Sequence, residues 1–408
     1  MEKKIEETFI KFAAPFGSSY IENGGPTSRL EDGLTALGNR AGLEVEVFAT
    51  PTGIFISSSK EGSTGVTVLQ RIKGGTTHLG EVVRLEGLLD SLSGDEESLK
   101  AGKIEINQRI PELSSWSLFS AAFVAGASVS YSQFGWGITC LLSGIITAGI
   151  ASLSGPISRF WQLSGILSDF LSSFLALSIG GLIAWWMKIP IEAIVIGPLV
   201  FLVPGLTLTN AVSELAEHNF VSGTAKTMKG VLILVAMGCA FFLTHDLSKL
   251  LGLGSPYTSS GSTTTLVEQF IGIPFLISAF GLIFKIPLKL LPFAVITGVS
   301  GWGLMITLAG MKFLILGTFL PALLVGLISL GFGRLFKTPS QIFSVPGIFS
   351  LLPGFLALSS FFSFSSGMQH KITEIGFQVL TIAASITFGL YVARIPYLAF
   401  EKRFGEPQ

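Results

Sequence analysis

Beyond position 115, hydrophobic residues form long runs that are separated by short polar breaks. The runs are about 20 residues long, which is the length that a helix needs to cross a bilayer. Each break carries a charge, a Pro-Gly cluster or both. This pattern predicts ten membrane-spanning helices, at residues 116–132, 134–153, 164–187, 191–211, 229–246, 266–284, 290–309, 313–333, 342–362 and 374–394.

The first 111 residues show shorter patterns, which are typical of a soluble α+β domain. Ser28 and Glu31 are spaced as a capping box, and apolar residues follow at helical spacing. Alternation of apolar and polar positions predicts three strands, at residues 43–49, 53–58 and 66–72. Two more helices are predicted, over 78–92 and from about 95 to 110, so the order is α-β-β-β-α-α. The charged N-terminus with no apolar segment behind it does not resemble a signal peptide.

An internal repeat is visible in the apolar part. Lys188-Ile-Pro190 and Pro204-Gly205 recur 149 residues later as Lys337-Thr-Pro339 and Pro353-Gly354. Each half then holds five predicted spans, and an odd number makes the second half enter the bilayer from the opposite side. Many secondary transporters have this arrangement, although a duplication without a transport role is the other interpretation.

The predicted fold class is therefore a polytopic α-helical membrane protein of ten spans. Two inverted five-span repeats, at residues 112–250 and 251–408, follow an N-terminal soluble α+β domain at 1–111. With that domain in the cytoplasm, ten Lys and Arg residues lie in the inner loops and tail and four in the outer loops. The positive-inside rule then predicts that both termini are cytoplasmic.

The charge distribution follows the same division. Residues 1–112 hold 12 Lys/Arg and 17 Asp/Glu, whereas the other 296 residues hold 14 and 9. Only 13% of the chain is charged, which excludes a wholly soluble enzyme and a disordered chain. The net charge of zero gives no indication of a nucleic-acid partner. Cys140 and Cys239 lie in apolar runs without metal-ligand spacing, and no metal or other cofactor is predicted.

The two Pro-Gly pairs are the main candidates for a substrate pathway. Proline removes an amide donor, and the carbonyls that it frees inside a bilayer need new partners. Broken helices at matching depth would direct backbone dipoles and polar groups towards the bundle centre. The candidate pathway residues are Pro204, Gly205, Thr207, Thr209, Asn210, Pro353 and Gly354. Plain proline kinks, with Thr and Asn bonded to their own helix, are the alternative.

Few acids lie in the apolar part, and an acid inside a span is a candidate for proton coupling. Asp169 lies five residues into the third span, Glu214 closes the fourth, and Glu268 is near the start of the sixth. Asp169 is the deepest of the three, although a cap on its helix N-terminus would explain it without transport.

The sequence contains no G-x-S-x-G, H-E-x-x-H or P-loop motif, so an enzyme is not predicted. His78 is a catalytic candidate in the first domain, but a solvated histidine at a helix start is the simpler interpretation.

Several segments resemble the threonine/serine exporters, a family of bacteria with fungal relatives. In the first domain they are Gly17-Ser-Ser19, Arg29-Leu-Glu31, Gly42-Leu-Glu-Val-Glu-Val-Phe48 and Pro51-Thr-Gly-Ile-Phe-Ile-Ser57. In the apolar part, Val203-Pro-Gly-Leu-Thr-Leu-Thr-Asn210 resembles the first Pro-Gly motif of the family and Leu352-Pro-Gly354 the second.

The resemblance implies export of threonine, serine or similar amino acids across the bacterial cytoplasmic membrane, driven by the proton gradient. The expected partners are a small amino acid or small carboxylate, protons and the lipid bilayer, and an oligomer is compatible with the sequence. A two-chain relative is associated with succinate export, so C4-dicarboxylate export is one alternative and a membrane-tethered hydrolase is another. No Lys or Arg lies deep in a predicted span, which favours a zwitterion over a dicarboxylate.

Overall fold

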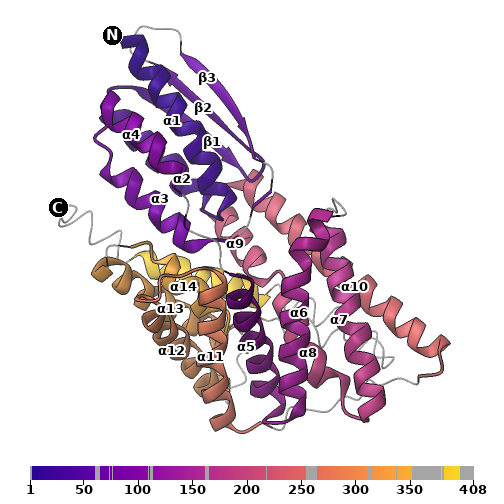
Figure 1. Cartoon of the computed structure of the whole chain (residues 1–408). Coiled ribbons are helices and arrows are strands. Elements are labelled where there is room, and N and C mark those ends of the chain that lie inside the picture. Colours follow the sequence, from indigo (N-terminus) through magenta and orange to yellow (C-terminus); the bar gives the residue numbers. More distant parts are fainter. Residues whose placement is uncertain are drawn as a thin grey trace.

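The computed structural model shows a small α+β unit standing on one end of a bundle of helices (Figure 1). We call these parts the N-terminal unit (residues 2–107) and the helical unit (residues 115–395). The structure describes residues 2–59, 65–72, 74–75, 77–108, 110, 114–160, 165–216, 218–253, 264–309, 315–336, 338–351, 378 and 381–395.

The N-terminal unit has a three-stranded antiparallel sheet of order β1-β2-β3, covered on one face by helices. Val47 of β1 pairs with Ile56 of β2, and Ile56 pairs with Val68 of β3. Its elements are α1 (Glu2–Glu22), α2 (Thr27–Arg40), β1 (Glu44–Thr50), β2 (Gly53–Ser59), β3 (Val66–Arg71), α3 (Leu79–Ser91) and α4 (Glu96–Ile106).

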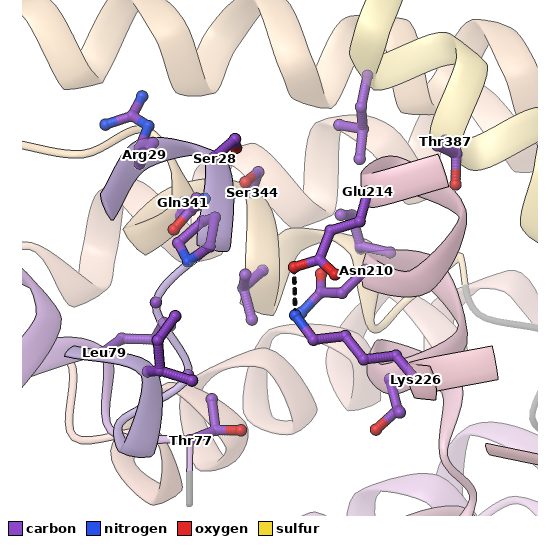
Figure 2. Close-up of a pocket in the computed structure, with 18 of the residues that line it drawn as sticks. Ser28, Arg29, Thr77, Leu79, Asn210, Glu214, Lys226, Gln341, Ser344 and Thr387 are labelled. Carbon is purple, nitrogen blue, oxygen red and sulfur yellow. Dashed lines mark hydrogen bonds and ion pairs between the residues drawn. The ribbon is translucent and has the colours of Figure 1, made fainter. Parts of the chain in front are cut away.

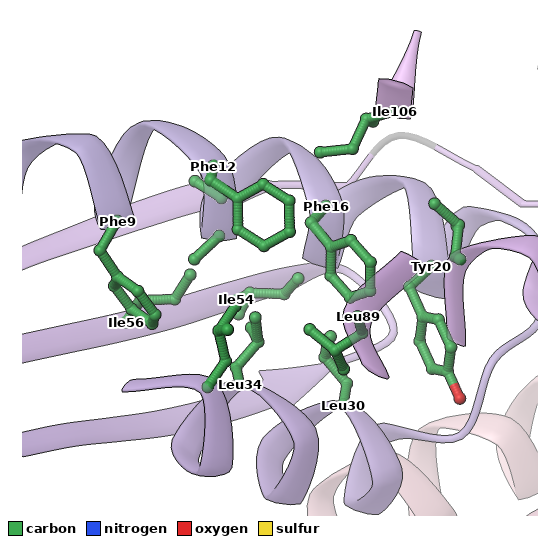
Figure 3. Packing of buried hydrophobic residues seen from close by; sticks show 14 of the residues in the cluster. Phe9, Phe12, Phe16, Tyr20, Leu30, Leu34, Ile54, Ile56, Leu89 and Ile106 are labelled. Carbon is green, nitrogen blue, oxygen red and sulfur yellow. The ribbon is translucent and has the colours of Figure 1, made fainter. Parts of the chain in front are cut away.

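The core of this unit is built on an aromatic stripe of α1. Phe9, Phe12, Phe16 and Tyr20 are three or four residues apart, so they lie on one face of the helix. All four are at most 2% exposed, and they contact Leu30 and Leu34 of α2 and Ile54 and Ile56 of β2 (Figure 3). Each buried aromatic side chain contributes a large apolar area, which lets a unit of this size hold a core of its own.

Two sequence-based expectations for the helices of this unit are wrong. The helix α1 was not predicted, so the observed order is α-α-β-β-β-α-α. Ser28 and Glu31 do not form a capping box, because Pro26 is the N-cap of α2 and makes no side-chain cap bond. The Oε1 atom of Glu31 instead accepts a bond of 2.7 Å from the backbone amide of Ala49 and joins α2 to β1.

The helical unit contains α5 to α14 and a last helix at Thr381–Ile395. The first five are α5 (Ser115–Phe134), α6 (Ile138–Phe160), α7 (Gly165–Met187), α8 (Ile191–Leu202) and α9 (Gly205–Ala216). The others are α10 (Phe220–Leu250), α11 (Leu266–Ile283), α12 (Leu291–Ala309), α13 (Leu316–Phe336) and α14 (Gln341–Ile348). By length and composition, five helices of the described part could cross a membrane, namely α7, α10, α11, α12 and α13. Shorter apolar helices lie at Ile138–Leu153, Ile191–Leu202 and Thr381–Ile395.

Small residues mediate the packing of α5 on α6. Ala122 and Ala148 are fully buried, and a Cβ atom on Gly126 would come within 2.0 Å of Thr147 Oγ1. Large apolar side chains point outwards instead, as Trp185 (50% exposed) and Trp186 (78% exposed) do. This distribution is typical of helices in a lipid bilayer. The hydrophobic effect does not drive helices together there, so they associate through close packing of small residues.

The predicted span over residues 191–211 is two helices. The first, α8, ends at Leu202, and α9 begins at Gly205 after Val203 and Pro204. The first predicted break is therefore present. The second pair, Pro353 and Gly354, lies outside the described residues.

Candidate functional site

A cavity of about 410 Å³ lies where the N-terminal unit meets the helical unit. Loops of the N-terminal unit form one side of it, and α9, α10, α13, α14 and the last helix form the rest. Its volume is within the range of small-molecule sites. Its polar lining includes Ser28, Arg29, Thr52, Thr77, Thr207, Asn210, Glu214, Lys226, Lys229, Ser329, Ser340, Gln341, Ser344, Thr387, Tyr391 and Arg394.

The broken helix supplies one face of α9 to this cavity. Thr207, Asn210 and Glu214 are three and four residues apart and all line it. Figure 2 shows Asn210 beside the carboxylate of Glu214, with Ser28, Arg29 and Ser344 on the opposite side. Two of the predicted pathway residues therefore meet one of the predicted coupling acids. The side chain of Thr209 is outside the described part.

Glu214 is the most deeply buried charge in this lining, at 3% exposure. Its Oε1 atom accepts from Lys226 Nζ of α10 and, at 3.4 Å, from Thr27 Oγ1 of α2. Its Oε2 atom is buried and, among the described residues, has no hydrogen-bond partner. A buried polar atom without a partner costs about 1–3 kcal/mol, so this oxygen has a strong tendency to bind whatever donor enters the cavity.

Ser329 of α13 presents a second such group. It is 1% exposed, and within the described part of the chain its hydroxyl makes no hydrogen bond. It also lines the cavity, although it is 115 residues from Glu214 in sequence. Two residues from distant helices thus line one cavity and each carries a buried polar atom without a partner in the described part, whereas buried polar groups are normally hydrogen-bonded.

Positive charge dominates the cavity lining. Arg29, Lys226, Lys229 and Arg394 line it, whereas Glu214 is the one acid among its lining residues in the described part. Lys226 is paired with Glu214, and Arg29 Nη1 lies 3.4 Å from Glu86 Oε2. No span has a central Lys or Arg in the sequence, but the cavity itself lies at the helix ends, where these cations gather.

The three candidate coupling acids lie apart. Asp169 is half-buried in the second turn of α7, where the charge of Lys229 attracts it. Glu268 forms the capping box of α11, where its Oε2 accepts from the backbone amide of Thr265 at 2.7 Å. The other end of α11 touches the N-terminal unit, because the amide of Leu79 donates to Phe284 O at 2.9 Å. At 1.5 Å per residue, Glu268 is about 24 Å from that contact, so it does not belong to the cavity.

His78 has a structural role that the sequence did not show. It is 5% exposed rather than solvated, and its Nδ1 accepts from the amide of Glu81 at 3.1 Å to cap α3. Glu81 is 2% exposed and receives Arg84 Nε on Oε1 and the amide of Ile110 on Oε2, both at 3.1 Å. Burial alone would raise the pKa of Glu81, but these bonds outweigh it and hold the pKa below its usual value.

Sequence reasoning missed most of the cavity. Lys226 and Lys229 are three residues apart in the second and third turns of α10, and this spacing on one helix face could have indicated them. Ser329, Gln341 and Ser344 carry no comparable signal, because serine is common throughout the apolar runs. In the described residues, no three His, Cys, Asp or Glu side chains form a group that could hold a metal ion.

Comparison with protein families gives two matches that together span most of the chain. A threonine/serine exporter model matches residues 11–247, and a second model of the same exporters, ThrE, matches residues 269–395. Comparison with curated proteins and with solved structures found no match. With its apolar helices, the chain is a multi-pass membrane protein. The matched segments include most of the N-terminal unit and the broken helix, and the chain belongs to the threonine/serine exporter family.

Proposed function

We propose that this protein exports threonine, serine or similar small amino acids from the cytoplasm by secondary transport coupled to the proton gradient. The observation that carries the proposal is the polar cavity beside the Pro204 break, where Asn210 and Glu214 of α9 face Ser329 and Gln341 from later helices. Polar groups at a helix break between two bundles are the usual site of secondary transporters. Membership of the exporter family supports the same function.

The proposed architecture is ten spans in two inverted repeats, in the bacterial cytoplasmic membrane with both termini inside. Support comes from α5 and α11, which pack against each other. The start of α5 follows Ile110, which bonds to Glu81 of the N-terminal unit, whereas α11 ends at the Leu79 contact. The two helices therefore run in opposite directions, as inverted repeats require. The N-terminal unit is then the cytoplasmic domain of residues 1–111.

Orientation can be tested by cysteine labelling in intact cells. Lys188 lies between α7 and α8, at the end of the bundle away from the N-terminal unit, and Lys289 lies beside the turn after α11. An impermeant thiol reagent should label Lys188→Cys and not Lys289→Cys. Both variants need the Cys140→Ser, Cys239→Ser background, because these are the two native cysteines. The reverse labelling pattern would place the N-terminal unit outside.

We propose Asp169 as the proton-coupling residue. Lys229 connects Asp169 to the cavity, because its charge attracts Asp169 and its side chain lines the site. An amide does not titrate, so Asp169→Asn should remove the pH dependence of transport and leave amino-acid exchange intact. Glu268→Gln is the matched control, because Glu268 caps a helix at the far end of the bundle. Unchanged pH-driven transport in Asp169→Asn would move the coupling role to Glu214.

A second candidate function is C4-dicarboxylate export, which the excess of cationic over acidic lining residues favours. Efflux of labelled threonine, serine and succinate from proteoliposomes under an imposed proton gradient separates the two. We expect both amino acids to move and succinate to stay. The paired change Pro204→Ala and Gly205→Ala should abolish efflux, because it restores a continuous helix. Succinate efflux without amino-acid efflux would replace the proposed substrate class.

A further inference from the structure

We propose that the cavity between the two units is a binding site for a hydroxylated zwitterionic amino acid, with Glu214 as the ligand of its ammonium group and Ser329 as the partner of its hydroxyl. The proposal rests on the proposed function, since it names the residues that recognise the exported molecule. It also gives the N-terminal unit a part in the site.

The ammonium subsite follows from the bonding of Glu214. Lys226 and Thr27 both bond to Oε1, which leaves Oε2 buried and, among the described residues, without a donor, on a side chain that lines the cavity. A primary ammonium group offers three donors and a positive charge, so it satisfies this oxygen completely. A dicarboxylate has no donor to offer at this position and would meet a like charge.

The hydroxyl subsite follows from Ser329. Its buried hydroxyl can donate and accept, and so can the side chain of threonine or serine. A site that binds a hydroxyl rejects analogues without one, because its own polar group is then left without a partner. Ser329 therefore discriminates between threonine and valine, which have nearly the same shape.

The carboxylate of the substrate lies towards the cationic side of the cavity. Lys226 is committed to Glu214, whereas Lys229 and Arg29 bring further positive charge to the lining. Arg29 belongs to the N-terminal unit, and so do Ser28 and Thr77 (Figure 2). Thr27, fully buried beside them, bonds directly to Glu214. The N-terminal unit thus supplies a wall of the site.

The test measures equilibrium binding of labelled L-threonine and L-valine to the purified full-length protein in detergent. Glu214→Gln keeps the size of the side chain and an acceptor for Lys226 and Thr27, and we expect it to weaken threonine binding at least tenfold. Ser329→Ala should weaken threonine binding about fivefold and leave valine binding unchanged, so that the preference for threonine is lost.

Matched controls are available in the same molecule. Ser173 of α7 is fully buried with a hydroxyl that lacks a partner among the described residues, but it does not line the cavity. Ser173→Ala should bind both amino acids as the wild type does. If Glu214→Gln does not purify as a folded protein, the charge-balanced double change Glu214→Gln with Lys226→Met replaces it, because it removes the ion pair as a whole.

Wild-type affinity for threonine in both Glu214→Gln and Ser329→Ala would overturn the site. An equal loss of threonine and valine binding in Ser329→Ala would overturn the hydroxyl assignment. Failure of the proposed function looks different: the wild type itself would then bind and transport no amino acid. Transport of threonine with unchanged KM by Glu214→Gln would contradict the proposed binding site but not the proposed exporter function.

Discussion

Glu81 and Glu214 are both almost completely buried, and both lie where the N-terminal unit meets the helices, yet their carboxylates are bonded very differently. Both oxygens of Glu81 are bonded, one to Arg84 and the other to the amide of Ile110. Glu214 has two donors on Oε1 and, in the described part of the chain, none on Oε2. The carboxylate of Glu81 thus has a donor on each oxygen, whereas that of Glu214 can accept a further hydrogen bond.

This difference in bonding separates a structural role from a functional one at two buried acids. A saturated buried acid stabilises its surroundings, because removing it leaves its partners unsatisfied. An unsaturated one costs stability, and a chain that keeps it has another use for it. Substitution of Glu81 should therefore lower the stability strongly, whereas substitution of Glu214 should change it little.

The largest effect should come from Glu81→Ala. The change removes the carboxylate to which the half-buried guanidinium of Arg84 and the amide of Ile110 donate, and it leaves Arg84 with only the backbone carbonyls of Glu105 and Ile106 among its described acceptors. We expect the free energy of unfolding of the N-terminal unit to fall by about 3 kcal/mol, measured by thermal or urea unfolding of the purified protein. Glu97→Ala, on the exposed face of α4, should change it by less than about 0.5 kcal/mol. Equal stability of the two variants would end the comparison.

A smaller effect should appear when Glu81 is protonated at low pH instead of being substituted. Because the folded pKa of Glu81 lies below the unfolded value of about 4.3, its contribution is complete above that value. It is lost as the pH falls through the lower folded pKa. The unfolding midpoint should therefore drop more steeply between about pH 5 and about pH 3 in the wild type than in Glu81→Gln, which cannot titrate. Parallel profiles would remove Glu81 from the acid response.

Thr27→Val should have an effect of about 1 kcal/mol or less, because the bond from Thr27 to Glu214 is long, at 3.4 Å. Valine keeps the shape of this fully buried side chain and removes its donor. We expect a two- to fivefold weaker affinity for threonine with little change in unfolding. Thr67→Val on exposed β3 is the control, since it removes a hydroxyl far from the cavity. A tenfold loss would show that Thr27 does more than orient Glu214.

The smallest change in stability should be that of Glu214→Gln. Loss of the ion pair with Lys226 is offset by removal of a buried charge whose second oxygen has no partner. We expect the unfolding midpoint to stay within the equivalent of about 0.5 kcal/mol of the wild type. A loss as large as that of Glu81→Ala would make Glu214 a structural acid like Glu81.

Much of the N-terminal unit could be predicted, because its strands alternate clearly. The predicted strand at 53–58 is β2 (Gly53–Ser59), and the predicted helix at 78–92 is α3 (Leu79–Ser91). The helix α1 could have been found from the spacing of Phe9, Phe12, Phe16 and Tyr20, but the charges before it hid the pattern. The capping box failed for a tertiary reason, since the amide of Ala49 binds Glu31.

The candidate site was predictable only in its local part. Pro204 and Gly205 predict the helix break. Thr207 and Asn210 follow the break within two turns, so one face of the cavity could be predicted from the sequence. Ser329 and Thr27 reach the cavity through packing between distant segments. No local pattern marks a serine that will lie opposite an acid 115 residues away.

In the described part of the chain, two of the hydrogen bonds between the N-terminal unit and the helices lie at separate places. Thr27 bonds to α9, and the amide of Leu79 bonds to Phe284 O just beyond α11, where the neighbouring Gly80 lies so close that a Cβ would come within 2.5 Å of Lys285 O. The N-terminal unit thus bridges α9 and the end of α11. A relative movement of α9 and α11 would therefore strain or break one of these contacts, so the N-terminal unit is mechanically coupled to both helices. The close contact with Lys285 O requires glycine at position 80, because any side chain there would clash with this carbonyl.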